Sequence, residues 1–139
     1  MPIQPYLFFN GRCDQAIALY KDALGARVEQ LLRYRESPEP APPGMLPPGF
    51  EDKVMHASLR IGDATLFVSD GNQDGGAQFQ GFSLSLTLPD EATLRSTFAA
   101  LSEEGVVKMA PARTFWSPCF GMLSDRFGVG WMLWVSDQT

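Results

Sequence analysis

The chain has 139 residues, of which 45% are hydrophobic and 19% charged, and its formal net charge at pH 7 is −5. This length and composition are typical of one globular domain with its own core, and they exclude a disordered chain. The acidic charge, the lack of a long apolar run or signal-peptide pattern, and the two cysteines together predict a cytoplasmic protein with no nucleic-acid or membrane partner.

A strand and a helix are predicted first. Residues 2–9 are rich in aromatic and aliphatic side chains, which favours a strand. Apolar residues then recur at helical spacing from Asp14 onward, and Gly25 predicts the end of that helix. We expect Asn10 or Asp14 to cap its start. Cys13 precedes the helix, where the helix dipole could lower the pKa of its thiol, although a free thiol without a function is the favoured interpretation.

Residues 26–35 predict a second strand, and residues 36–52, ESPEPAPPGMLPPGFED, follow it. The proline and glycine content of this segment excludes a helix or a central strand, so we expect a surface loop. Long loops in compact domains are often functional, and a lid over a pocket is the favoured role. A PxxP-type peptide ligand is the alternative.

Residues 54–70 form the most informative stretch, because they predict a hairpin around Gly62-Asp63. A two-residue turn places Ser58 opposite Phe67 and His56 opposite Ser69. Apolar residues then share one face of the hairpin, and His56, the only histidine of the chain, lies on the other face.

The second half begins with a glycine-rich linker, residues 71–81. A strand is predicted at 82–88, a helix from 90 that ends at Gly105, a short strand from 106 to 109, and a connection over 110–118. Two strands around a turn near 125–128 complete the chain.

The same order of elements therefore occurs twice, and the two halves end on the tripeptides at 68–70 and 135–137, both Val-Ser-Asp. We predict an α+β fold of two tandem βαβββ modules, each with its helix on one face of its sheet, whose open faces can curve toward one another to make a cavity. The chain is expected to be a single domain, with module one at 1–71, a linker at 72–80 and module two at 81–139.

The polar faces of these strands predict a ligand cavity, because a few polar groups there accompany bulky apolar ones. The alternative is a plain sheet face exposed to water. The candidate ligand-binding residues are His56, Ser58, Phe67, Ser69, Ser83, Ser85, Trp116, Met132 and Trp134. No carboxylate is placed to orient His56, so a structural or ligand-orienting histidine is favoured, and no catalytic residue is assigned.

Four segments carry a resemblance to a known family: PYLFFNG, AIALYKDALGA, HASLRIGDATLFVSD and SDRFGVGWML. They resemble the PhnB-like branch of the vicinal oxygen chelate superfamily, which includes glyoxalase I, extradiol dioxygenases, fosfomycin-resistance transferases and bleomycin-binding proteins. The resemblance implies paired βαβββ modules that form a U-shaped, half-open β-barrel with the helices outside, often assembled as dimers. It also places the metal-ligand positions of the superfamily at Pro5, Phe67, Ser83 and Met132, none of which is a competent ligand.

We therefore expect a small-molecule-binding protein, a homodimer, with no catalytic metal and no other cofactor. Its specific activity is left open. The alternatives are an enzyme of the same superfamily that uses a metal or His56, a resistance protein that sequesters an antibiotic, and an interaction module that uses the proline-rich segment.

Overall fold

The computed structural model describes residues 2–136, and the chain divides into two compact units, residues 1–77 and 78–139. The division falls inside the predicted linker. Each unit holds one α-helix and one four-stranded sheet. No helix among residues 2–136 is both long enough and apolar enough to cross a bilayer.

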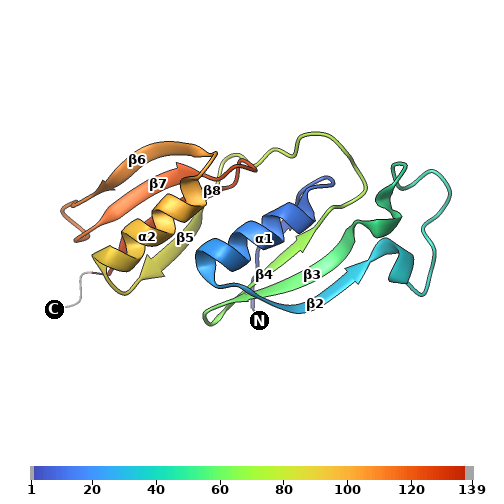
Figure 1. The fold of residues 1–139 in the computed structure, drawn as a ribbon, viewed down its shortest axis with the longest axis horizontal. Helices are drawn as coiled ribbons and strands as arrows, with labels where there is room; N and C mark the ends of the chain where they lie inside the picture. Colours follow the sequence, from blue (N-terminus) through green and yellow to red (C-terminus); the bar gives the residue numbers. More distant parts are fainter. Residues whose placement is uncertain (1, 137–139) are drawn as a thin grey trace. The chain divides into compact units, whose positions relative to one another are not determined.

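The first unit has its α-helix on one face of the sheet (Figure 1). Its strands run in the order β1-β4-β3-β2, with β1 parallel to β4 and the other neighbours antiparallel. The elements are β1 (Tyr6–Phe8), α1 (Cys13–Leu24), β2 (Arg27–Arg33), the short 3-10 turns η1 (Tyr34–Glu36) and η2 (Phe50–Asp52), β3 (Val54–Ile61) and β4 (Ala64–Ser69).

The second unit repeats this topology with the strand order β5-β8-β7-β6, and β5 is parallel to β8. Its elements are β5 (Leu84–Leu88), α2 (Glu91–Ser102), β6 (Val106–Ala112), β7 (Phe120–Ser124) and β8 (Gly130–Val135). The internal duplication and the α+β class are therefore confirmed. Of the two closing tripeptides, the second runs past residue 136, so Asp137 lies outside the described residues.

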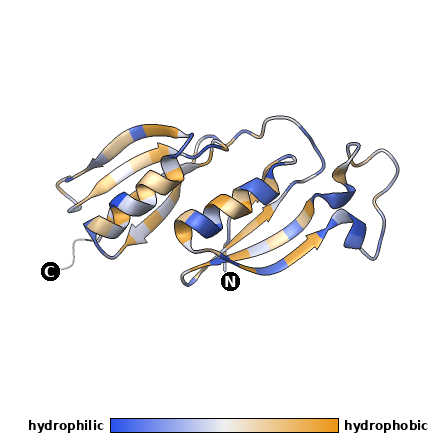
Figure 2. Ribbon diagram, viewed as in Figure 1, coloured by the Kyte–Doolittle hydropathy of each residue, from blue (hydrophilic) through white to orange (hydrophobic). Residues whose placement is uncertain are grey.

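The central hairpin has the predicted register. Ser58 pairs with Phe67 and Ile61 with Ala64, around the turn at Gly62-Asp63. Leu59 and Val68, predicted for the apolar face, are completely buried. The strands of both sheets are largely hydrophobic and the helices mixed (Figure 2), as expected where one face of each element packs on the core.

The predicted cap of α1 was wrong. The helix begins after Arg12, and no side chain next to its start caps it. Instead, the buried carboxylate of Asp70, at the end of β4, accepts hydrogen bonds from the backbone N–H groups of Gly11 and Cys13, both at 2.8 Å. The helix ends as predicted at Gly25, which adopts the left-handed conformation with φ 66°.

The end of α2 also differs from the prediction. The helix stops at Ser102, before the predicted end at Gly105, and Glu104 takes a positive φ of 61°. Gly105 is required for another reason: a Cβ there would lie 2.3 Å from the carbonyl oxygen of Ser124. The glycine lets the start of β6 pack directly against the backbone at the end of β7.

Three strand boundaries also differ from the prediction. β1 begins only at Tyr6, because Pro2 and Pro5 lack the N–H that a longer strand needs. β5 begins at Leu84, where its pairing with β8 starts. β6 extends to Ala112, beyond the predicted short strand, because it continues to pair with β7.

The core of each unit lies between its helix and its sheet. In the first unit Tyr20 of α1 is fully buried, as are Leu59 and Val68 of the sheet; in the second, Leu94 and Leu133 are fully buried. The opposite face of each sheet is not covered by a helix of its own unit (Figure 1). The residues of these open faces are therefore the candidates for binding.

Candidate functional site

An aromatic cluster occupies the open face of the first sheet. Tyr6 stacks on Phe8 with ring centroids 5.0 Å apart, and it lies 5.7 Å from the rings of both His56 and Phe67. His56 and Phe67 are 5.4 Å apart. Sequence reasoning found His56 and Phe67 but missed Tyr6 and Phe8. Alternation around the buried Leu7 of β1 is the signal that could have found them.

Within this cluster, the hydroxyl of Tyr6 lies 3.0 Å from Nδ1 of His56. Partial burial raises the pKa of Tyr6, so the phenol keeps its proton at neutral pH. A phenol that keeps its proton can donate to Nδ1 or accept from it, so this contact fixes the position of the His56 ring and not its tautomer. Tyr6, which was not a predicted partner, therefore helps to orient the ring of His56.

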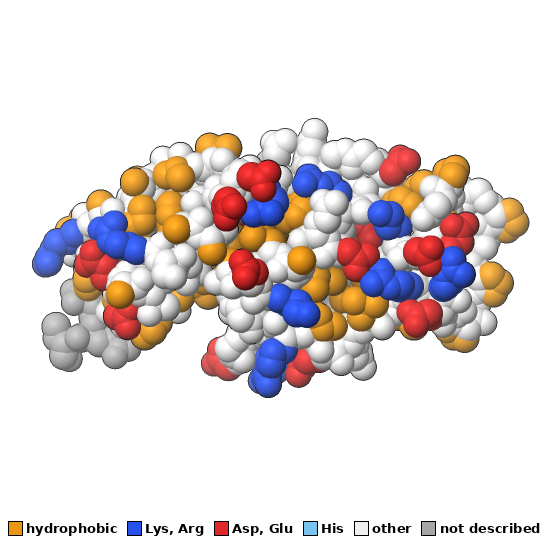
Figure 3. Space-filling model, in the orientation of Figure 1, with side chains coloured by type: hydrophobic (Ala, Val, Ile, Leu, Met, Phe, Trp, Pro, Cys, Tyr) orange, Lys and Arg blue, Asp and Glu red, His pale blue; other side chains and the backbone are white. Residues whose placement is uncertain are grey.

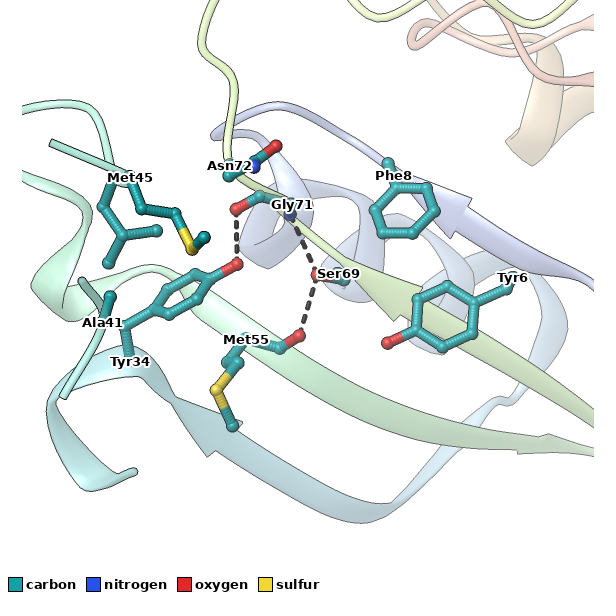
Figure 4. Close-up of a pocket in the computed structure, with 10 residues that line it drawn as sticks. Tyr6, Phe8, Tyr34, Ala41, Met45, Met55, Ser69, Gly71 and Asn72 are labelled. Carbon is teal, nitrogen blue, oxygen red and sulfur yellow. Dashed lines mark hydrogen bonds between the residues drawn. The ribbon is translucent and has the colours of Figure 1, made fainter. Parts of the chain in front are cut away.

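A pocket of about 360 Å³ adjoins this cluster (Figure 4). The sheet provides one wall, and the proline-rich loop between η1 and η2 provides the other. The lining residues are Tyr6, Phe8, Tyr34, Ala41, Met45, Leu46, Met55, Ser69, Gly71 and Asn72. Ala41, Met45 and Leu46 belong to the loop that was predicted to lie over a pocket. Of the candidate residues, only Ser69 lines this pocket.

The polar groups of the pocket wall are largely paired with one another. Ser69 donates its hydroxyl to the carbonyl oxygen of Met55 at 2.8 Å and accepts the backbone N–H of Gly71 at 2.9 Å (Figure 4). The hydroxyl of Tyr34 donates to the carbonyl oxygen of Gly71. Burial raises the pKa of Tyr34, so this donor stays protonated. The wall is therefore neutral and already hydrogen-bonded.

Ion pairs fasten the base of the loop. Arg33 donates to both carboxylate oxygens of Asp14 at 2.9 Å and to the carbonyl oxygen of Asp52 at 2.8 Å. Arg35 pairs with the side chain of Asp52, and the Tyr34 N–H donates to the carbonyl oxygen of Lys53 at 3.2 Å. Charges of both signs are intermixed on the face seen in Figure 3. The two ends of the loop are thus joined to each other, and its first end is joined to α1.

The remaining predicted residues divide between the units. Ser58 is buried opposite Phe67 in the first unit. In the second, Trp134 donates its indole N–H to the hydroxyl of Ser85 at 3.0 Å, and Met132 pairs with Ser85 across the sheet.

The two other candidates of the second unit lie outside its strands. Ser83 immediately precedes β5. Trp116 makes an edge contact with Phe120 at 5.4 Å, and its neighbour Phe115 is 96% exposed. The structure therefore brings together His56, Phe67, Ser58 and Ser69 in one unit, and Ser85, Met132 and Trp134 in the other.

The positions that correspond to the metal ligands of the resembled superfamily do not fit a divalent cation. Pro5 offers only a carbonyl oxygen, which accepts the N–H of Phe67 at 3.0 Å, and Phe67, Ser83 and Met132 supply no imidazole or carboxylate. Among residues 2–136 no group of three or more histidine, cysteine, aspartate or glutamate side chains is placed to hold a metal ion.

Cys13 does not have the environment of a reactive thiol. It is the first residue of α1 and is completely buried, and burial together with the charge of Asp70 raises its pKa far above the ordinary value. This outweighs the helix dipole, which could have lowered the pKa, and it agrees with the favoured interpretation of a free thiol without a function. Cys119 is also buried, with a raised pKa.

Comparisons with known proteins identify the family. The family model of the Glyoxalase/Bleomycin resistance protein/Dioxygenase superfamily matches residues 3–133. Protein YjdN of Escherichia coli is 36% identical over 145 residues, which cover 99% of this chain and 97% of YjdN. This chain belongs to that superfamily.

Solved structures agree with this assignment and show a PhnB-like member. Protein PA1353 from Pseudomonas aeruginosa is 38% identical with a TM-score of 0.82, and the match covers 98% of each chain. A PhnB protein from Bacillus cereus is 25% identical with a TM-score of 0.81, covering 98% of this chain and 100% of that one. A glyoxylase/bleomycin resistance protein/dioxygenase domain from Frankia, 10% identical with a TM-score of 0.68 over 96% of this chain and 94% of that one, shares the fold.

Proposed function

We propose that this protein binds a small molecule in the pocket between the first sheet and the proline-rich loop, without the metal that other members of the superfamily use. The observation that carries the proposal is the pocket itself. Its volume of about 360 Å³ lies within the ~300–1,000 Å³ that is usual for ligand sites. Its walls combine aromatic and methionine side chains with a few polar groups, the usual composition of such sites.

The loop supports this proposal because it is held in place without being part of the core. Met45 is 49% exposed and Ala41 is also exposed, while Phe50 at the end of the loop is buried. A segment fastened at its base and exposed along its length can present side chains to a ligand at little cost to the fold. This role is favoured over a PxxP peptide ligand, because the same segment forms a wall of the pocket.

Methyl NMR of methionine tests the proposal directly. Met45 and Met55 line the pocket, and Met109 and Met122 of the second unit serve as internal controls. A library of one- and two-ring compounds is titrated into protein labelled at the methionine methyl groups. We expect some compounds to shift Met45 and Met55 and to leave the control signals in place. A library that leaves Met45 and Met55 unmoved, or that moves only the controls, would overturn the proposal.

A loop variant completes this test. Replacing residues 38–48 with a short glycine-serine linker removes one wall of the pocket, while Arg33 and Tyr34 at the base keep their partners. We expect the variant to fold and to lose the shift at Met55. A shift of unchanged size at Met55 would show that the compounds bind elsewhere.

The absence of metal chemistry is a separate part of the proposal. It rests on the donor groups available, since the superfamily ligand positions hold proline, phenylalanine, serine and methionine. Protein purified without chelators is expected to contain no stoichiometric metal by elemental analysis, and Ni²⁺, Co²⁺, Mn²⁺ and Zn²⁺ are expected to cause no large thermal shift. One equivalent of bound metal with a large shift would contradict this.

A second candidate function, an acid–base enzyme, is favoured only by the hydrogen bond between Tyr6 and His56. The Tyr6 hydroxyl occupies Nδ1, and a lone histidine with no carboxylate to orient it suits ligand orientation better than base catalysis. If the enzyme hypothesis holds, His56→Ala abolishes a measured turnover while the far-UV circular dichroism stays unchanged. If the binding hypothesis holds, the variant only weakens binding, because His56 does not line the pocket itself and acts through its contact with Tyr6.

We also propose that the protein is a homodimer. Apolar side chains that are exposed in the single chain support this, among them Phe115 at 96% and Val106 at 59%. Light scattering after size exclusion is expected to give twice the chain mass of 15.3 kDa. The mass of one chain at micromolar concentration would refute this assembly.

A further inference from the structure

The chemistry of the pocket wall restricts what it can bind. We propose that the ligand is an uncharged, flat ring system of one or two rings that carries a single hydrogen-bonding group. This inference rests on the proposed binding function and specifies the ligand class of the same pocket.

The first argument is charge. None of the pocket-lining residues identified within the described chain carries a charged side chain. The nearby ionic groups are occupied elsewhere: Arg33 is paired with Asp14, and Arg35 with Asp52. A charged ligand would lose part of its hydration on entering and gain no ion pair in return, which is unfavourable. A neutral ligand carries no such penalty.

The second argument is shape. Tyr6 and Phe8 project from the same face of β1, and their rings are nearly parallel, with an interplanar angle of 26°. Figure 4 shows these two rings on one side of the pocket and Tyr34 with Met45 on the other. Flat rings stack well on aromatic faces, and thioether sulfurs make favourable contacts with ring edges. At about 30 Å³ per water molecule, the volume corresponds to roughly a dozen waters, or one to two fused rings with a substituent.

The third argument is the polar inventory. The hydroxyl groups of Ser69, Tyr34 and Tyr6 already have partners within the protein. The carboxamide of Asn72 is exposed, and no hydrogen bond to it is found within residues 2–136. Ser69 and Tyr34 already donate their hydroxyl protons within the protein, so a ligand with several hydrogen-bond acceptors would leave most of them unpaired. One donor or acceptor directed at Asn72 is what the wall can accommodate.

Three compounds with the same ring system test the charge argument: 2-naphthamide, 2-naphthoate and 2-naphthylmethylammonium. They are titrated at neutral pH while the methyl signals of Met45 and Met55 are followed. We expect 2-naphthamide to bind more tightly than either ion by roughly tenfold or more. Equal or tighter binding of an ion at the same two methionines would overturn the ligand class and leave the binding function intact.

A charge placed in the pocket provides the matched control. Asn72→Lys is expected to raise the affinity for 2-naphthoate by roughly fivefold and to lower the affinity for 2-naphthamide, which loses its carboxamide partner. Gln73→Lys adds the same charge one residue away, at an exposed position outside the lining, and is expected to have little effect. Equal gains in the two variants would show that the charge acts from outside the pocket and would refute the class. If none of the three compounds shifts the methyl signals of Met45 or Met55, the ligand class is refuted. The binding function is then tested separately by the library titration described under the proposed function.

Discussion

The carboxylate of Asp70 offers the sharpest test of how the first unit is held together. It is completely buried, and three backbone N–H groups donate to it: Gly11 and Cys13 at 2.8 Å and Val54 at 2.9 Å. One side chain thus accepts hydrogen bonds from the backbone N–H groups at the start of both α1 and β3. Asp70→Ala would leave all three donors without this acceptor.

The expected loss follows from those bonds. A buried donor left unpaired costs about 1–3 kcal/mol, so three would cost up to roughly 9 kcal/mol if nothing replaced the carboxylate. Water can enter the space of the lost side chain and restore part of this, so we expect a loss of about 3–5 kcal/mol. That is a large fraction of the ~5–15 kcal/mol by which domains are usually stable. Asp70→Asn keeps one acceptor oxygen and should fall between the wild type and Asp70→Ala.

The assay must report on the first unit. All three tryptophans lie in the second unit and all three tyrosines in the first, so tryptophan fluorescence reports unfolding of the second unit and not of the first. We therefore measure urea unfolding by far-UV circular dichroism and hydrogen exchange at the amides of Gly11, Cys13 and Val54, which lie in the first unit. Asp22→Ala, an exposed change in α1, is the control and should cost less than about 0.5 kcal/mol. Asp70→Ala within 1 kcal/mol of the wild type, with protection of the three amides unchanged, would refute the reasoning.

Three further predictions concern other parts of the chain. Arg33 lowers the pKa of Asp14, so this pair stabilises the fold above the unfolded carboxyl pKa of about 4, and the contribution is lost as the pH falls through the lower folded value. The wild type should therefore be more stable than Asp14→Asn at neutral pH, by at most about 1 kcal/mol because the pair is half-exposed. Urea unfolding at acid pH should show no difference between the two proteins. Gly105→Ala should destabilise the second unit by about 2–4 kcal/mol in urea unfolding followed by tryptophan fluorescence, because its Cβ would meet the Ser124 carbonyl, whereas Gly76→Ala meets nothing and should be neutral. The two buried cysteines should resist a disulfide-exchange reagent in the native protein and react in denaturant; rapid native labelling would contradict their burial and raised pKa values.

Local rules were sufficient for the hairpin and the duplication. A two-residue turn fixes the register of both flanking strands, so Ser58 opposite Phe67 follows from Gly62-Asp63 alone. The element order of the first half, repeated in the second, then predicts two sheets of the same topology, which the strand orders confirm.

The cap of α1 and the pocket depend on contacts that no local rule contains. Asp70 lies 57 residues from Cys13, and a nearby Asn10 or Asp14 satisfies every local criterion for a cap. The loop was predicted as a lid, but its composition does not tell which of its residues meet the sheet. That choice depends on the closure of its base by Arg33, from an adjoining strand.

The two units share a topology, but the side chains on their open sheet faces differ. Tyr6 on the edge strand β1 lies beside Phe67 on β4, and at the corresponding place in the second unit, counted from the shared Val-Ser-Asp, Thr87 on β5 lies beside Trp134 on β8. The connection also differs: residues 34–53 join β2 to β3, whereas only residues 113–119 join β6 to β7. The pocket needs both the edge-strand aromatic and the long connection, and the first unit alone has them. Duplication therefore explains the scaffold, while the departures from it, in one strand and one loop, account for the site.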